Sequence, residues 1–109
     1  MNNAEEYKLV RQVIGINVGA IRKQRKLSQA KLAESISVDR SYVNQLEGGK
    51  ENVTVDILVK LADGLDVPLT TLLTGLHLDP PYKLDRAAFN YAYVPLDGNS
   101  ERPRASKDE

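Results

Sequence analysis

Apolar residues recur at helical spacing in five stretches of this chain, and turn-forming residues separate one stretch from the next. In the first stretch Val10, Ile14, Val18 and Ile21 stand three or four residues apart, on one face of a helix. The stretches that follow are shorter and end at glycine, aspartate or proline. The pattern predicts a compact all-α fold with helices over residues 9–26, 29–35, 40–47, 55–65 and 69–73.

Residues that favour helix ends stand at the boundaries of these stretches. Ser28, Asp39 and Thr54 precede the second, third and fourth helices as N-caps, and the pair Gly48-Gly49 ends the third. Two glycines lie inside the first helix, and each costs up to about 1 kcal/mol relative to alanine. We therefore expect the first helix to depend on packing against its neighbours.

The third helix has one polar face. With Val43 and Leu46 turned inward, the outer face carries the polar residues Arg40, Ser41, Asn44 and Gln45. Arginine pairs with guanine edges, and asparagine or glutamine pairs with adenine edges, in the major groove of DNA. The face is therefore a candidate base-reading surface, and the alternative is a solvated polar face.

A series of short motifs stands in a fixed order over residues 14–73: Ile14-Gly15, Ile21-Arg22, Leu27-Ser28-Gln29, Leu32-Ala33, Val38-Asp39-Arg40-Ser41, Leu46-Glu47-Gly48-Gly49, Leu58, Leu61-Ala62, Leu65, Val67 and Leu72-Leu73. This series resembles the lambda-repressor-like helix-turn-helix regulators, the XRE family. Within the family, residues 39–43 and 51–55 look most like the controller proteins of restriction-modification systems. The family usually has glycine where this chain has Ser37, and serine takes left-handed geometry only with strain, so we expect a turn of slightly different shape.

The resemblance assigns roles to several positions. It implies a structural ion pair between Arg22 and Glu47 beneath the motif, and a DNA phosphate contact by Gln29 in the first turn of the second helix. Tyr42 lies either over the DNA backbone or a thymine methyl, or against the neighbouring helix. In the loop that follows the third helix, Lys50 and Asn52 are candidate phosphate ligands.

The formal net charge is zero, but the charges are unevenly distributed. Between Lys8 and Lys50 the chain has nine basic and three acidic residues, whereas from Glu51 onward it has six basic and ten acidic residues. The positive half carries the motif, and phosphate attraction depends on the local surface, so DNA binding is compatible with neutrality.

Composition argues against several other functions. There is no cysteine, hence no disulfide or thiolate metal site, and residues 1–7 contain no apolar run. The single histidine, His77, has no second ligand at a metal-binding spacing. We expect a soluble cytoplasmic protein without membrane span, cofactor, metal or catalytic residues, and not an enzyme.

The composition changes after residue 76. Residues 79–81, Asp-Pro-Pro, break any helix, and four of the six aromatic residues follow them: Tyr82, Phe89, Tyr91 and Tyr93. Large and small side chains alternate over 89–94, which predicts a strand, although residues 84, 87, 88 and 91 also fit a helical stripe. We expect a DNA-binding domain over 1–76, an extension for dimer or partner contact over 77–96, and a flexible polar tail over 97–109.

Two functions remain. The first is a homodimeric transcription regulator, a repressor or autoregulator, that binds an inverted-repeat operator in double-stranded DNA. The second is an antitoxin-like DNA-binding adaptor whose aromatic extension binds a protein partner.

Overall fold

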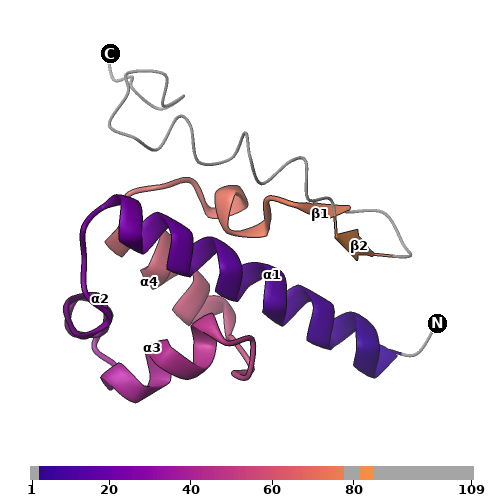
Figure 1. Cartoon of the computed structure of the whole chain (residues 1–109), viewed down its shortest axis with the longest axis horizontal. Coiled ribbons are helices and arrows are strands. Elements are labelled where there is room, and N and C mark those ends of the chain that lie inside the picture. The colour runs from indigo at the N-terminus through magenta and orange to yellow at the C-terminus, as the bar shows by residue number, and fades with distance from the viewer. Residues whose placement is uncertain (1–2, 78–81, 85–109) are drawn as a thin grey trace, which may run out of the picture.

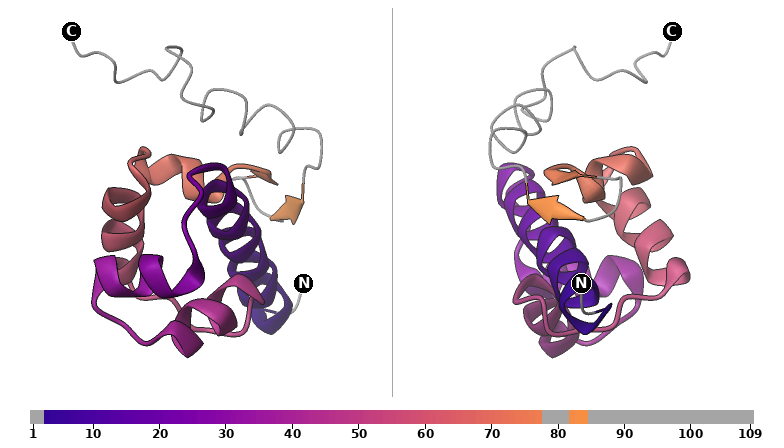
Figure 2. Two further views of the ribbon diagram at one scale, coloured as in Figure 1. Left: turned by 60° about the vertical axis from the view of Figure 1, so that its left-hand side comes forward. Right: turned by 90° about the vertical axis from the view of Figure 1, so that its right-hand side faces the viewer.

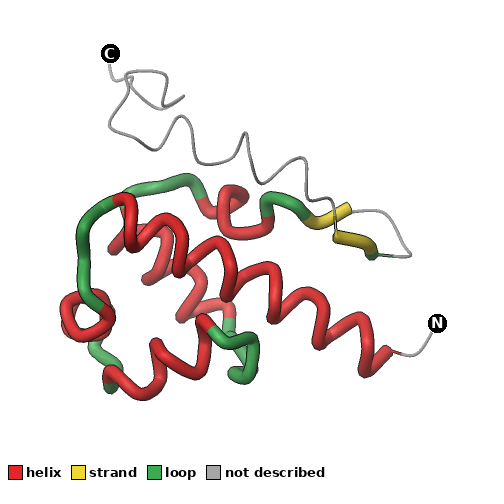
Figure 3. Tube along the Cα trace, viewed as in Figure 1, coloured by secondary structure: helices red, strands yellow, loops and turns green. Residues whose placement is uncertain are grey.

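The computed structural model describes residues 3–77 and 82–84 of the chain. Its elements are α1 (Asn3–Gln24), α2 (Gln29–Ile36), α3 (Arg40–Glu47), α4 (Val55–Leu65), the 3-10 helix η1 (Leu69–Leu73), β1 (Leu76–His77) and β2 (Lys83–Leu84). Helix α1 is the longest element and contacts α3, α4, η1 and β2 (Figure 1). In Figure 1 α3 lies below α1, and η1 with the two strands lies above it. The views of Figure 2 show α1 from other sides, between α3 and the strands. The all-α class is confirmed (Figure 3).

Helix α1 begins earlier than its apolar pattern indicates. It starts at Asn3, with Glu5 and Glu6 in its first turn, where acidic side chains interact favourably with the helix dipole. It ends at Gln24, and Lys26 then takes a left-handed conformation with a φ of 61°. The amide of Leu27 donates to the carbonyl of Arg22 at 3.0 Å, which closes the last turn.

The core lies between α1 and the other helices. Among the described residues its buried apolar members are Val13, Ile14, Val18, Ile21, Leu32, Ala33, Ile36, Val43, Leu46, Leu61, Ala62, Leu65, Val67 and Leu72. These positions are the inward faces of the spacing pattern. The close approach of α3 to α1 depends on Gly15, where a Cβ atom would lie 2.5 Å from the carbonyl oxygen of Leu46.

One buried polar residue was not expected from the sequence. Asn17 is fully buried, and its Nδ2 donates to the carbonyls of Leu72 at 2.8 Å and Thr74 at 2.9 Å. These carbonyls lie at the end of η1, where a helix leaves acceptors without intrahelical partners. Asn17 therefore ties η1 to α1.

The prediction of five α-helices is wrong by one. The fifth predicted helix has the expected bounds but is the 3-10 helix η1. Pro68 precedes it in an extended conformation, and the chain turns extended again at Thr74, with a ψ of 137°. Only five residues lie between these points, and so short a segment commonly forms 3-10 turns.

Two short strands follow η1. Strands β1 and β2 pair antiparallel, with Leu76 opposite Leu84 and His77 opposite Lys83. The predicted strand over 89–94 lies outside the described residues, as do Phe89, Tyr91 and Tyr93. The described pair was not predicted, and it crosses the boundary expected after residue 76.

Candidate nucleic-acid interface

The helix pair α2–α3 has defined caps at three of its four ends. Ser28 accepts a hydrogen bond from the amide of Lys31 at 3.0 Å, which caps the start of α2. Ser37 ends α2 with a φ of 62° and a ψ of 46°, and the amide of Val38 donates to the carbonyl of Ala33 at 3.0 Å. The serine thus takes the left-handed backbone that a glycine would take.

Helix α3 has the predicted bounds, Arg40–Glu47. Asp39 has the extended backbone of an N-cap, but its side chain makes no capping hydrogen bond, so the expected carboxylate cap is absent at this residue. At the other end the amide of Gly48 donates to the carbonyl of Asn44 at 3.1 Å.

The four candidate base-reading side chains share one surface. Val43 and Leu46 of α3 are buried, and this fixes the rotation of the helix about its axis. As a consequence Arg40, Ser41, Asn44 and Gln45 are all exposed, at positions one and four residues apart on the opposite face. Every position of this face can donate a hydrogen bond, and Ser41, Asn44 and Gln45 can also accept one.

Two candidate phosphate ligands lie in the loop after α3. Lys50 and Asn52 are exposed there. Gly49 holds the loop against α1 with a φ of 75°, and a Cβ atom at this glycine would lie 2.9 Å from Cγ of Gln12. The position of the loop is therefore set by packing on α1.

Tyr42 packs inward. It is half-buried and contacts the hydrophobic core. Burial, and to a smaller extent the carboxylate of Glu51, raises the pKa of its phenol, which stays protonated at neutral pH. Of the two positions that the sequence left open, the structure shows the contact with the neighbouring helices.

Arg22 and Glu47 form the ion pair that the family resemblance implied. Arg22 Nε lies 2.6 Å from Glu47 Oε2, and Arg22 Nη2 lies 3.1 Å from Glu47 Oε1. Arg22 Nη1 also donates to the carbonyl of Leu27 at 2.8 Å. Both charged groups are nearly buried, with 10% and 12% of their side-chain surfaces exposed. The pair joins α1 to the end of α3.

Gln29 makes side-chain contacts that sequence reasoning missed. Its Nε2 donates to Glu47 Oε1 at 3.0 Å, and its Oε1 accepts a hydrogen bond from Asn44 Nδ2 at 3.4 Å. The side chain lies between the ion pair and the exposed face of α3. No signal in the sequence shows this bridge, because it depends on the crossing of α2 over α3.

Eight of the nine basic residues of the motif half fall into two groups, and the ninth, Arg11, is half-buried on α1. Arg22 is bound to Glu47, and Arg25 donates to the carbonyls of Leu65 at 3.0 Å and Asp66 at 3.1 Å, at the end of α4. The exposed cations are Lys8, Lys23, Lys26, Lys31, Arg40 and Lys50. Exposed cations are the groups that attract a polyanion.

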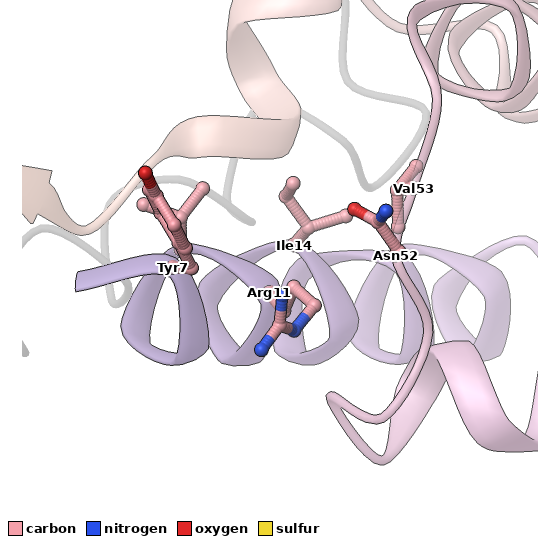
Figure 4. A pocket seen from close by; sticks show the side chains of 6 residues that line it. Tyr7, Arg11, Ile14, Asn52 and Val53 are labelled. Atoms are coloured by element: carbon pink, nitrogen blue, oxygen red, sulfur yellow. The ribbon is translucent and has the colours of Figure 1, made fainter. Parts of the chain in front are cut away.

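A pocket of about 430 Å³ lies between α1 and the loop after α3. Tyr7 and Ile14 project from the same side of α1, Ile14 lies next to the loop residue Asn52, and Arg11 lies at the near side of the helix (Figure 4). Val10 completes the lining, which is aromatic or aliphatic apart from Arg11 and Asn52. The pocket therefore adjoins one of the candidate phosphate ligands.

Residues 3–77 and 82–84 contain neither a metal-binding cluster nor a membrane-spanning helix. No group of three or more histidine, cysteine, aspartate or glutamate side chains there could hold a metal ion. Over the same part of the chain, no helix combines the length and the apolar character that crossing a membrane requires.

Comparison with known proteins agrees with this geometry. The helix-turn-helix family profile matches residues 18–72. The chain is 34% identical over 65 residues to control protein C.SmaI of Serratia marcescens, covering 60% of this chain and 77% of that protein. It is 33% identical over 60 residues to the immunity repressor protein of Bacillus phage phi105, covering 55% of this chain but only 42% of the phage protein.

A solved structure shows the same arrangement. The restriction-modification controller protein C.AhdI from Aeromonas hydrophila has a TM-score of 0.55 and 35% sequence identity, covering 57% of this chain and 94% of that one. The resemblance seen in the sequence, including its likeness to controller proteins, is confirmed. The chain belongs to the helix-turn-helix family of XRE type.

Proposed function

We propose that this protein is a sequence-specific DNA-binding regulator of transcription, a repressor or autoregulator, that acts as a homodimer. One observation carries the proposal. The exposed polar face of α3 is held in place by buried Val43 and Leu46 and by the ion pair to α1, in a chain of the helix-turn-helix family. Relatives with this motif are named control protein and immunity repressor.

In this proposal α3 enters the major groove. Arg40 and Ser41 lie at the start of the helix, where recognition helices contact base edges, and Asn44 and Gln45 follow one turn later. All four are exposed, so none has to leave the core to reach a base.

The DNA backbone contacts surround this helix. Lys50 and Asn52 are exposed after its end, and Gln29 lies at the start of α2. Tyr42 is half-buried, and its exposed part is a further candidate for a backbone contact. These contacts position the helix, whereas the base contacts give sequence preference.

Dimerisation follows from the size of the reading surface and from exposed apolar side chains. One eight-residue helix reads only a few base pairs, and a second copy extends the site to two half-sites. Val55 and Val59 lie one turn apart on α4 and are 72% and 46% exposed, and Leu69 on η1 is 46% exposed. These exposed apolar side chains are candidates for contact with a second copy.

The chain divides by role in this proposal. Residues 1–76 bind DNA, residues 77–96 add a dimer or partner contact, and residues 97–109 form a polar tail. Tyr82, directly before β2, is half-buried.

The test is selection of bound DNA from a random duplex pool by the purified full-length protein near physiological salt. We expect an inverted repeat with half-sites about one helical turn apart. Sedimentation of the complex should give two protein copies per duplex. If no sequence is enriched, or if one copy binds one half-site, the proposal is overturned. A different protein that co-purifies through the aromatic extension would favour the adaptor function instead.

Arg40→Ala then tests the face itself. Loss of one arginine–guanine contact should weaken operator binding by about 1 to 3 kcal/mol and relax preference at one base pair. Lys23→Ala is the matched control, since Lys23 is an exposed cation at the end of α1. A uniform loss on all sequences after Arg40→Ala would make Arg40 a phosphate contact.

A further inference from the structure

A row of hydrogen bonds runs from the ion pair to the base-reading face. Glu47 Oε1 accepts from Arg22 Nη2 at 3.1 Å and from Gln29 Nε2 at 3.0 Å. Gln29 Oε1 then accepts from Asn44 Nδ2 at 3.4 Å. Glu47 and Asn44 stand three residues apart on α3, so they share one side of the helix, and Gln29 reaches them from the start of α2.

The chemistry of the four side chains determines which group donates and which accepts in each of these hydrogen bonds. A guanidinium only donates and a carboxylate only accepts, whereas an amide side chain does both. Gln29 must therefore turn its NH2 group toward Glu47, and its carbonyl oxygen then faces Asn44. Because that oxygen only accepts, Asn44 must turn its own NH2 group toward Gln29. The charge of Glu47 thus decides the orientation of two neutral amides.

The orientation of Asn44 matters for base recognition. Its bond to Gln29 uses one of the two amide hydrogens, so the second hydrogen and Oδ1 remain available. Adenine presents an acceptor at N7 and a donor at N6, and reading it takes one donor and one acceptor from the same amide. We propose that Gln29 is a positioning residue that sets the base preference of Asn44.

The inference rests on the proposed function, because it takes Asn44 as a reader of bases. It gives Gln29 a role beyond a backbone contact. A phosphate contact changes affinity for every sequence alike, whereas a positioning contact changes the discrimination at one base pair.

Burial increases along the row toward the ion pair. Asn44 is exposed, Gln29 is half-buried, and the side chains of Glu47 and Arg22 are 12% and 10% exposed. The bond between Gln29 and Asn44 is therefore the most exposed of the set, and it is also the longest. Covering α3 with DNA removes water from this bond and strengthens it.

Gln29→Met is the decisive variant, because methionine keeps the length of the side chain and removes both hydrogen-bonding groups. Binding is measured on the selected operator and on operators changed at each base pair, for the wild type, Gln29→Met, Asn44→Ala, Arg40→Ala and the double variant Gln29→Met/Asn44→Ala. Asn44→Ala and Arg40→Ala identify the base pair that each residue reads.

Discrimination is the ratio of the affinity for the selected operator to that for an operator changed at one base pair. We expect Gln29→Met to reduce this ratio about 3- to 10-fold at the base pair that Asn44 reads, which is the range of one neutral hydrogen bond. Discrimination at the base pair of Arg40 should stay within about twofold. In the Asn44→Ala background, Gln29→Met should cause no further loss of discrimination. The inference is overturned if Gln29→Met lowers the affinity for all operators equally. It is also overturned if Gln29→Met causes the same loss of discrimination in the wild type and in the Asn44→Ala variant.

A second measurement on the free protein requires no operator. The side-chain amide signals of Asn44 in a nitrogen–proton NMR spectrum should shift in Gln29→Met toward those of an exposed asparagine. Asn52, which is exposed on the loop after α3, is the internal control and should not move. Unchanged Asn44 signals with an intact base preference overturn this inference alone. A wild type without base preference overturns both this inference and the proposed function.

Discussion

Arg22 Nε on α1 lies 2.6 Å from Glu47 Oε2 on α3, and the same carboxylate accepts a hydrogen bond from Gln29 on α2. One nearly buried carboxylate therefore connects the three helices that place the polar face. The last turn of α3 cannot move without breaking this connection. The orientation of α3 thus depends on a nearly buried residue that lies outside its exposed polar face.

Glu47→Ala should lower the free energy of unfolding by about 3 kcal/mol, because it leaves a nearly buried guanidinium without its carboxylate. Urea denaturation followed by circular dichroism measures this loss. The matched control is Lys31→Ala, since Lys31 and Glu34 form an ion pair whose side chains are 71% and 77% exposed, 3.8 Å apart. Removing that pair should change the free energy by less than about 1 kcal/mol. Equal losses in the two variants would contradict the role assigned to burial.

Gly15→Ala should destabilise the protein although alanine favours helices. Its Cβ atom would lie 2.5 Å from the carbonyl oxygen of Leu46 and 2.7 Å from that of Glu47, so α1 and α3 must separate. We expect a loss of about 2 kcal/mol or more, beyond the gain of roughly 1 kcal/mol in helix propensity.

Gly19→Ala provides the comparison within the same helix. Its Cβ atom would meet only the side chain of Glu47, at 3.4 Å, which is ordinary contact. The propensity gain of about 1 kcal/mol should then leave the variant as stable as the wild type or more so. If both alanine variants were equally stable in thermal unfolding, the close approach at Gly15 would be disproved.

Ser37→Gly should stabilise the turn between α2 and α3 by roughly 0.5 to 1 kcal/mol. Serine has a φ of 62° there, and the left-handed region is strained for a residue with a Cβ atom. Ser35→Gly, inside α2, should instead cost about 0.5 kcal/mol because glycine is a poor helix former. If the melting temperature rose equally in both variants, relief of backbone strain at Ser37 would not be the cause of the stabilisation by Ser37→Gly.

Asn17→Asp should make stability depend on pH. The new carboxyl is buried beside the carbonyls of Leu72 and Thr74, so its pKa is raised in the folded state relative to the unfolded state. The folded state then binds more protons, and stability is greatest below the unfolded pKa and falls as pH rises through the folded pKa. Urea denaturation gives the free energy of unfolding of both proteins at pH 4 and at pH 7. The variant should be less stable than the wild type by a larger amount at pH 7 than at pH 4. A pH-independent difference between the two proteins would contradict the burial of this side chain.

The sequence alone predicted the parts of the fold that rest on local signals. The bounds of α3 follow from Asp39 and Gly48, and its rotation follows from the spacing of Val43 and Leu46. These predictions rest on helix-capping residues and on the helical period of apolar residues, and neither signal depends on contacts between distant residues. The roles of the exposed side chains of α3 stay predictions until DNA binding is measured.

The features that the sequence did not show depend on contacts between distant residues. Asn17 stands four residues after Val13 and four before Ile21, so the helical period places it on the core face, but the spacing does not identify the carbonyls that it binds. Arg25 lies in a run of basic residues near the end of α1, and it binds the carbonyls at the end of α4. Neither partner can be identified before α1, η1 and α4 are brought together.

The left-handed residues at the helix ends have a consequence for the evolution of this protein. Lys26, Ser37 and Asp66 follow α1, α2 and α4 with φ values of 61°, 62° and 58°. All three are exposed, so glycine could replace each of them without opening a cavity, and each replacement would relieve about 1 kcal/mol of strain. A lineage could therefore offset a destabilising change on α3 by substitutions at these ends, and so vary the exposed side chains of α3 without losing its fold.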